Sequence, residues 1–572
     1  MKTDLCVSSR TKHLVFCILL AAAAAYVIFM CPYRFVVTDE AFFLTIPMRL
    51  FQGDALFQHE WHLSQLASML TLPFVSLYLM LQGNTEGIVL AMRYFGAFVQ
   101  LCVAVFVYIR FQRFHWLGAL IASLCFLLYT PFNSSCLLYP SLGIYSFILC
   151  FTIVCTARKA QRLQYTIAGL FFAAGVLCCP YMAFAFALYL IFVFLKEKLV
   201  GKRDMERYPI FSPACAIHMT LGAAIAAGLF LIFTLSRASL SAILASIPYI
   251  LDDPEHIYVS MWVKALNFFL GFFFAGPNIP ELYCAMAALF VLHCIDRKRQ
   301  QHDPLYIGIA AGITIAIIVI QYSRFHYVNH TMWPINIFAL FLVLITNDKT
   351  ARLFFHTFWL PGMAYAFCYQ LASNQDFYAT AAGSSVATVG SVFITVLVLH
   401  QQLRSLSSAP LSKIAVGMIC LLLTAQVFFQ VYARCYLFFL QPEPQNAHCV
   451  KVEDGCCKGL LVSRNMYHTY YDQMEDVALL KERGFRKMLF LSDSSWYYLF
   501  DNFEICTYST WLSGVNDHTL LRLQAYYTIN PEKLPDAVLV EFENREYGEK
   551  FCDMMNYHME ETENFLLLLP NT

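Results

Sequence analysis

Apolar segments of roughly membrane-span length recur along most of this chain, and they restrict its fold more than any other feature. A transmembrane helix needs about 20 mainly apolar residues. The composition agrees, because 59% of the 572 residues are hydrophobic and 13% are charged, against about 25% charged in soluble domains. We therefore predict a polytopic α-helical membrane protein with about thirteen transmembrane helices. The expected spans lie near 14–31, 88–109, 117–132, 140–156, 165–179, 181–195, 214–235, 280–295, 305–320, 331–346, 352–370, 378–399 and 412–432.

Basic residues between the apolar segments predict the orientation, since cytoplasmic loops are enriched in Lys and Arg. Lys2, Arg10 and Lys12 precede the first segment, so we expect it to be a signal anchor with a cytoplasmic N-terminus. Thirteen spans then place the C-terminal part outside the cytoplasm. The apolar stretches 66–82 and 261–276 would invert the pattern, so we interpret both as helices at the outer interface, with a re-entrant pair as the alternative. The basic loops are 110–113, 158–162, 196–207, 297–299, 349–352 and 404–413.

The charge distribution divides the chain into two parts. Residues 441–572 hold 11 Lys and Arg against 21 Asp and Glu, a net charge of −10, although the whole chain is neutral. In this tail the helical segment YDQMEDVALLKERGF alternates with the strand-like segments KMLFLS, DAVLVEF and FLLLL, which is typical of an α/β domain. We expect a transmembrane body over 1–441 and an extracytoplasmic soluble α/β domain over 442–572.

A long first outer loop, residues 32–87, carries the acidic pair Asp39-Glu40 shortly after the first span. Thr38 or Asp39 could cap a helix that starts there. A carboxylate at the outer membrane surface could also accept a proton from an acceptor hydroxyl or amine, or hold a divalent ion. The sequence leaves the capping and catalytic interpretations open.

Two further groups could bind a metal or a substrate. His59-Glu60-Trp61-His62 places two imidazoles and a carboxylate within four residues, and on a helix His59 and His62 would share a face. A polar interfacial face is the simpler interpretation. Asp253 and His256 lie in another expected outer loop, where a turn is the simpler interpretation. A divalent metal ion is the only cofactor we consider, with Glu60, His62, Asp253 and His256 as its candidate ligands.

Three basic side chains lie where an anionic group could bind. Arg93 falls inside an apolar segment near its outer end, where a charge is costly and therefore often functional. Arg324 and His326 fall in an expected outer loop, against the positive-inside trend. They could pair with a lipid phosphate, or extend to lipid headgroups without a specific role.

The arrangement resembles the GT-C superfamily of membrane glycosyltransferases, and in layout the protein O-mannosyltransferases and the lipid A aminoarabinose transferases. Those families have an Asp-Glu after the first span, then a Gly-Asp, a Pro-Leu stretch and an Arg in the next span. The corresponding residues here are Asp39-Glu40, Gly53-Asp54, Leu72-Pro73 and Arg93. The motifs lie mainly in 37–96 and 320–335, whereas the layout covers most of the chain.

This resemblance implies roles for particular residues. Asp39 would be the catalytic carboxylate and Glu40 its partner, while Glu60 matches a glutamate that lies near the site, often by a metal. Arg324 and His326 would meet the phosphate of a polyprenyl-phosphate sugar. The Lys-Pro-Pro run of the aminoarabinose branch is absent, and His62 and its neighbours stand in its place.

We therefore expect an inverting glycosyltransferase of the plasma membrane. It would move a sugar from a polyprenyl-phosphate donor to a cell-envelope glycan, lipid or protein, with Arg93, His59, Glu60 and His62 near the substrate. A transporter or flippase of a lipid-linked envelope precursor is the alternative. Membrane lipids are expected partners, whereas nucleic acid is not, since the chain has no net positive charge.

Overall fold

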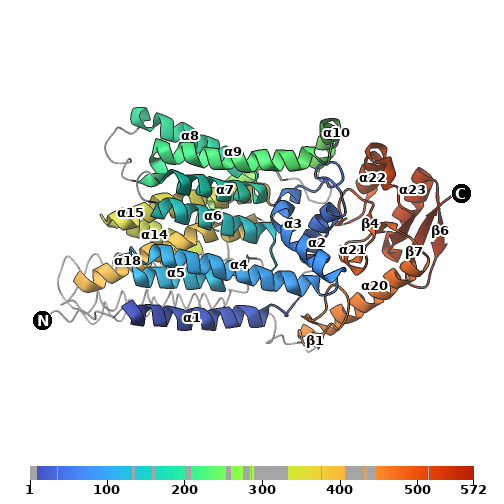
Figure 1. Ribbon diagram of the computed structural model, residues 1–572, viewed down its shortest axis with the longest axis horizontal. Helices are drawn as coiled ribbons and strands as arrows, with labels where there is room; N and C mark the ends of the chain where they lie inside the picture. Colours follow the sequence, from blue (N-terminus) through green and yellow to red (C-terminus); the bar gives the residue numbers. More distant parts are fainter. Residues whose placement is uncertain are drawn as a thin grey trace.

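The computed structural model of the chain describes residues 9–34, 37–131, 136–157, 161–199, 208–252, 259–274, 333–374, 376–405, 446–512 and 514–571, with a few single positions between 284 and 291, at 431–435 and at 443. A bundle of long helices and a C-terminal region built on a β-sheet follow one another along the long axis (Figure 1). The N-terminus lies at the free end of the bundle and the C-terminus at the opposite end of the molecule.

The helices of the bundle coincide with the expected apolar segments. Five helices in the described part are long and apolar enough to cross a membrane, or six if the bent pair α17–α18 forms one span. Four of the five belong to the bundle, and the fifth, Gln65–Gln82, lies in the segment 32–87. The protein is thus a multi-pass membrane protein, but thirteen spans are not confirmed. The segments expected near 280–295, 305–320 and 412–432 lie wholly or mostly outside the described residues. The bundle helices are α1 (Ser9–Met30), α4 (Ile88–Phe111), α5 (Trp116–Leu128), α6 (Tyr139–Thr156), α7 (Arg162–Cys178), α8 (Met182–Leu199), α9 (Pro213–Leu235), α14 (Trp333–Ile345), α15 (Lys349–Phe354), α16 (Leu360–Ala372), α17 (Asp376–Gly383) and α18 (Ser385–Ser405).

Glycines allow α7 and α9 to pack at very short range. A Cβ atom at Gly169 would lie 2.1 Å from the carbonyl oxygen of Met219, and one at Gly222 would lie 2.0 Å from that of Thr166. Small residues permit such close backbone approach between helices in membranes, where packing rather than the hydrophobic effect drives association. These two positions therefore fix how closely α7 and α9 approach.

Residues 32–87, the segment expected to form the first outer loop, contain α2 (Val37–Phe51) and α3 (Ser68–Gln82), which lie between the bundle and the C-terminal region (Figure 1). Helix α2 begins at Val37, so Asp39 and Glu40 occupy its first turn. The prediction of a helix at this point is confirmed, but the prediction that Thr38 or Asp39 caps it is wrong. The stretch 66–82 is helical, as the end of a short 3-10 helix (Gln65–Ala67) and α3, and the described part of 261–276 is α11 (Met261–Phe274), which α10 (Leu240–Leu251) precedes.

The C-terminal region contains a five-stranded sheet with the order β4-β3-β5-β7-β6. Strand β3 is parallel to β4 and β5, whereas β7 runs antiparallel to β5 and β6. The predicted strands correspond to β3, β5 and β7, whose uninterrupted apolar runs suit strands covered on both faces. The elements are β1 (Val450–Lys451), β2 (Leu461–Val462), α20 (Arg464–Glu482), β3 (Lys487–Leu491), α21 (Tyr497–Phe500), β4 (Glu504–Ile505), α22 (Asp517–Ile529), β5 (Ala537–Val540), α23 (Arg545–Met555), β6 (Tyr557–Glu561) and β7 (Leu566–Pro570).

The C-terminal region and α2 share one buried apolar cluster. Phe42 and Ile46 of α2 belong to it, and so do Trp496, Leu499 and Leu539 from the C-terminal region. Because apolar side chains from both regions leave water together, their burial stabilises the contact. The C-terminal region thereby helps to hold α2, the helix that carries Asp39 and Glu40, in place.

Candidate functional site

Asp39 lies half-buried in the first turn of α2, at the junction between the bundle and the C-terminal region. Among the described residues, no hydrogen bond or ion pair occupies its carboxylate. Burial raises the pKa of Asp39, the neighbouring Glu40 charge raises it further, and Arg34 lowers it in part. A carboxylate with unused lone pairs and a raised pKa can accept a proton from a substrate group.

Glu40 and Arg93 form a buried ion pair beside Asp39. Arg93 Nε donates to Glu40 Oε1 at 3.2 Å, and a second guanidinium nitrogen contacts Glu40 Oε2. The third nitrogen donates to the backbone carbonyls of Cys31 at 2.7 Å and Tyr33 at 3.0 Å. This pair joins α4 to α2 and to the end of α1, and it occupies every nitrogen of the Arg93 guanidinium.

Arg34 is a candidate that the sequence analysis missed. Its backbone has a φ of 64°, in the left-handed region that only a few per cent of non-glycine residues adopt. The Arg34 N–H donates to the Leu461 carbonyl at 3.0 Å, so the C-terminal region holds this conformation in place. The guanidinium interacts electrostatically with Glu40 and Asp39 but forms no ion pair within the described residues. A partly buried guanidinium within electrostatic reach of Asp39 is suited to an anionic substrate group.

One signal in the sequence could have identified Arg34. It is the first basic residue after the first span, on the side that the positive-inside rule leaves poor in Lys and Arg. The same argument singled out Arg324, which lies outside the described residues together with His326.

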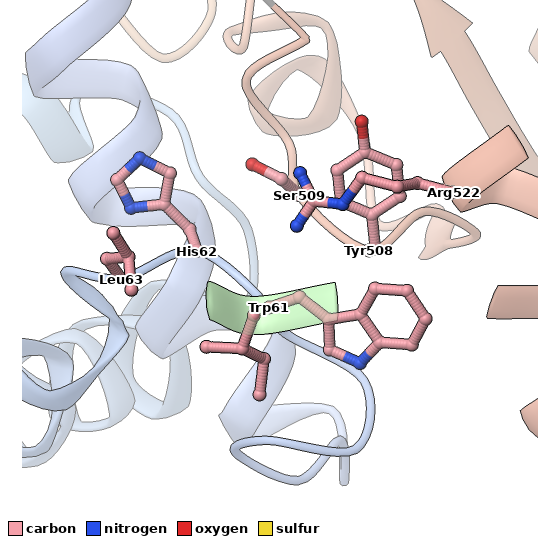
Figure 2. A pocket seen from close by; sticks show the side chains of 7 residues that line it. Trp61, His62, Leu63, Tyr508, Ser509 and Arg522 are labelled. Carbon is pink, nitrogen blue, oxygen red and sulfur yellow. The ribbon is translucent and has the colours of Figure 1, made fainter. Parts of the chain in front are cut away.

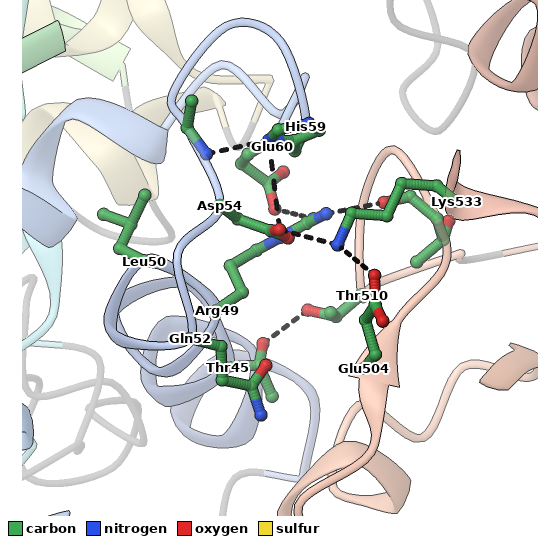
Figure 3. A network of polar contacts seen from close by, with 12 residues as sticks. Thr45, Arg49, Leu50, Gln52, Asp54, His59, Glu60, Glu504, Thr510 and Lys533 are labelled. Atoms are coloured by element: carbon green, nitrogen blue, oxygen red, sulfur yellow. Dashed lines mark hydrogen bonds and ion pairs between the residues drawn. The ribbon is translucent and has the colours of Figure 1, made fainter. Parts of the chain in front are cut away.

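Glu60 lies in a second buried charge network, at the contact between the first outer loop and the C-terminal region (Figure 3). Arg49, fully buried on α2, donates from Nε to Asp54 at 2.9 Å and from another nitrogen to Glu60 at 2.8 Å. Lys533 Nζ contacts Asp54 at 2.6 Å and Glu504 at 3.0 Å. Glu60 is therefore part of an ionic connection between the two regions.

The protein shifts the pKa values of Glu60 and Asp54, two carboxyl groups of this network, in opposite directions. Burial raises the pKa of Glu60, and the attraction of Arg49 offsets only part of that effect. Burial acts on Asp54 in the same sense, but Arg49, Lys533 and His59 together outweigh it and lower its pKa. Asp54 is therefore ionised at neutral pH.

The two histidines of the loop do not share a helical face, so that expectation is wrong. Residues 59–62 lie in turns and extended backbone between α2 and α3. His59 Nδ1 accepts from the Ala55 N–H at 2.9 Å, whereas His62 Nδ1 lies 2.7 Å from the Ser64 hydroxyl. Burial lowers the pKa of His59. The His62 ring packs against Phe42, with 4.6 Å between ring centroids.

A small pocket lies next to His62, between the loop and the C-terminal region (Figure 2). Its volume of about 10 Å³ corresponds to roughly one water molecule. Arg522 donates to the Tyr249 carbonyl at 2.7 Å and stacks on the Tyr508 ring at 4.3 Å. The pocket is too small for a sugar, and its side chains hold the two regions together. It is lined by Trp61, His62, Leu63, Ile250, Tyr508, Ser509 and Arg522.

A metal site is not formed by the described residues. Nowhere among them do three His, Cys, Asp or Glu side chains converge on one position. The Glu60 oxygens accept from Arg49 and from the His62 N–H, and the candidates Asp253 and His256 lie outside the described residues. The prediction of a metal ion therefore stays untested.

No family model matches the sequence, and no curated protein matches it as a relative. Among solved structures, the apo oligosaccharyltransferase of Archaeoglobus fulgidus is similar over 92% of this chain and 70% of the oligosaccharyltransferase chain, with 11% sequence identity and a TM-score of 0.50. The same enzyme with zinc and sulfate covers 96% and 73%, with 11% identity and a TM-score of 0.49. ArnT from Cupriavidus metallidurans covers 98% of both chains, with 13% identity and a TM-score of 0.44.

These likenesses concern the fold. The oligosaccharyltransferase and ArnT are both members of the GT-C superfamily. The described helices and the C-terminal sheet region of this chain are similar in arrangement to that fold, so the resemblance expected from the sequence is confirmed at the level of architecture.

Proposed function

We propose that this protein is a membrane glycosyltransferase of the GT-C type. It transfers a sugar from a polyprenyl-phosphate donor to a glycan, lipid or protein acceptor outside the plasma membrane. The N-terminus is cytoplasmic, and residues 442–572 form an extracytoplasmic domain. The GT-C-like fold, the multi-pass bundle and the position of Asp39 support this proposal. The unoccupied Asp39 carboxylate at the junction is the observation that carries it.

In the proposed reaction, Asp39 is the base. The acceptor hydroxyl or amine attacks the anomeric carbon from the face opposite the phosphate, so the configuration inverts. The acceptor proton passes to the Asp39 carboxylate, and the C–O bond to the phosphate breaks with its electron pair on the leaving polyprenyl phosphate. The raised pKa of Asp39 makes this carboxylate a stronger base than an ordinary exposed one.

Arg34 is the proposed partner of the leaving phosphate. Its guanidinium lies within electrostatic reach of Asp39 and is not neutralised by a direct ion pair among the described residues. A guanidinium can bind phosphate oxygens through two parallel N–H groups, and it stabilises the charge that develops as the bond breaks. Arg93 is a poorer candidate for that role, because all its nitrogens are already engaged.

The Glu40–Arg93 pair then acts as a positioning element. Asp39 is the immediate neighbour of Glu40, so the ion pair that ties Glu40 to α4 also fixes the first turn of α2. The negative charge of Glu40 additionally raises the pKa of Asp39. Glu40 thus assists Asp39 without touching the substrate.

The direct test is release of polyprenyl phosphate from labelled polyprenyl-phosphate sugars, by the full chain in liposomes with cell-envelope extract as acceptor. Asp39→Asn should lower turnover by about 10²–10⁴-fold, the usual contribution of a general base. Glu86→Gln is the matched control, since Glu86 lies in the same outer loop and pairs with Lys458 at the surface. Equal turnover in wild type and Asp39→Asn would remove Asp39 from the mechanism. No release from any donor would favour the transporter alternative.

A further inference from the structure

A groove lies on α4, α6 and α7 of the bundle, away from the proposed catalytic site. Its volume is about 530 Å³, within the range of roughly 300–1,000 Å³ that is usual for ligand pockets. Its wall is apolar over most of its length, and Phe98 at its rim is 60% exposed. The lining residues include Phe98, Cys102, Phe106, Arg110, Ile153 and Gln164.

The polar side chains of the groove gather at one end. Arg110 lies in the last turn of α4 and Gln164 in the first turn of α7, at the end of the bundle that faces away from the C-terminal region (Figure 1). Arg110 Nε donates to the Thr156 hydroxyl at 2.8 Å and the guanidinium lies over the Phe106 ring, but its other nitrogens have no hydrogen-bond or ion-pair partner among the described residues. The Gln164 side-chain oxygen is buried without a described hydrogen-bond partner. This end thus offers both donors and an acceptor to a ligand.

The dimensions of the groove match one leaflet of a bilayer. Phe98 and Arg110 are separated by twelve positions along α4, which corresponds to about 18 Å at roughly 1.5 Å per residue. Half of the hydrocarbon core of a membrane is about 15 Å thick. A single acyl chain in the groove would therefore place its headgroup at Arg110.

The charge of this surface favours an anionic headgroup. Residues 87–196 contain no Asp or Glu, whereas Arg110 and Arg113 lie at the end of α4 that adjoins the polar end of the groove. Basic side chains at the membrane boundary attract anionic lipids. The donor of the proposed reaction would instead place its phosphate at Arg34, near Asp39 at the other end of the bundle.

We propose that this groove binds one anionic glycerophospholipid of the membrane, with an acyl chain along α4, α6 and α7 and the phosphate at Arg110. The phosphate oxygens accept from the unpaired guanidinium N–H groups, and a headgroup hydroxyl, as in phosphatidylglycerol, donates to the Gln164 side-chain oxygen. The lipid would be a resident component of the protein and not the sugar donor.

The test is native mass spectrometry of the full chain from nanodiscs that contain phosphatidylglycerol and phosphatidylcholine in equal amounts. The wild type should retain one phosphatidylglycerol in preference to phosphatidylcholine. Arg110→Gln should lower that retention by about tenfold or more, as expected for the loss of a charged hydrogen bond. Arg162→Gln removes the same charge from an exposed position outside the groove and should retain the lipid.

A second variant tests the chain-binding part of the groove. Cys102→Trp fills the groove from its exposed rim and leaves the Arg110–Thr156 hydrogen bond in place, so it should also reduce lipid retention. Equal retention of the two lipids, equal loss in Arg110→Gln and Arg162→Gln, or retention of a polyprenyl phosphate instead of a phospholipid would each overturn the proposal. None of these readouts depends on transferase activity.

Discussion

Replacing Arg49 by methionine would test whether the buried charge network holds the C-terminal region on the first outer loop. Arg49 is fully buried and interacts with Asp54, Glu60, the Thr507 carbonyl at 3.0 Å and the Tyr526 hydroxyl at 3.3 Å. Methionine retains much of the side-chain length but removes the charge and every donor. Asp54 keeps Lys533 at 2.6 Å, so Glu60 is the carboxylate left without a cation.

The size of the effect follows from the protonation of Glu60. Breaking a buried ion pair by removing one partner costs about 3–5 kcal/mol. The stability lost in Arg49→Met has an upper limit. Without Arg49 the folded-state pKa of Glu60 rises further, so Glu60 takes up a proton and is no longer a buried charge without a partner. Protonation from an ordinary glutamate pKa costs about 3.7 kcal/mol at pH 7 but about 1 kcal/mol at pH 5. A raised folded-state pKa destabilises the fold as pH increases, so Arg49→Met should lose more stability at pH 7 than at pH 5.

Thermal unfolding of the detergent-solubilised protein at both pH values would measure this difference, with identical scan rates because membrane proteins often unfold irreversibly. Arg49→Met/Glu60→Gln is the matched control, since it removes the stranded charge. At pH 7 the double variant should unfold at a higher temperature than Arg49→Met, and the gap should shrink at pH 5. A gap that is absent, or that does not change with pH, would refute the reasoning.

Two further predictions concern the catalytic junction and the bundle. Asp39 must be ionised to accept a proton and its pKa is raised, so kcat/KM should fall on acidification at a pH above the ordinary aspartate value. Arg34→Gln should shift that fall to still higher pH, because Arg34 lowers the Asp39 pKa; an unchanged pH profile would contradict the assignment. Gly222→Ala should destabilise the protein by about 1–3 kcal/mol, because the new Cβ would meet the Thr166 carbonyl at 2.0 Å. Gly228→Ala on the same helix, with nothing within 4 Å, should leave the unfolding temperature nearly unchanged.

Local segments of the sequence predicted much of the secondary structure. The apolar runs near 88–109 and 214–235 correspond to α4 and α9, and the tail segments KMLFLS and DAVLVEF to β3 and β5. Helices form hydrogen bonds within one segment, and their environment is reflected in the hydropathy of that segment. Strand β6 was not anticipated, because its sequence YHMEE is polar and lacks the apolar run of a buried strand, although it forms a local antiparallel hairpin with β7.

The histidine motif shows where local patterns were insufficient. His59-Glu60-Trp61-His62 suggested one polar helical face, but the chain turns there and the side chains point to different neighbours. Glu60 meets Arg49 on α2, and the Trp61 ring stacks on Tyr508 of the C-terminal region, with 5.8 Å between the ring centroids. The Glu60 contact depends on the tertiary fold of the loop, and the Trp61 contact depends on the docking of the C-terminal region; the four-residue pattern encodes neither.

The sequence by itself determined that this chain enters a membrane many times, ends in a region of mixed helix and strand, and carries an acidic pair after its first span. The tertiary structure decided which of those charges neutralise one another. It paired Glu40 with Arg93, 53 positions away, and left Asp39 next to Arg34 without a direct partner among the described residues. Hydropathy is a property of each segment, whereas the partner of a buried charge is set by the packing of distant segments.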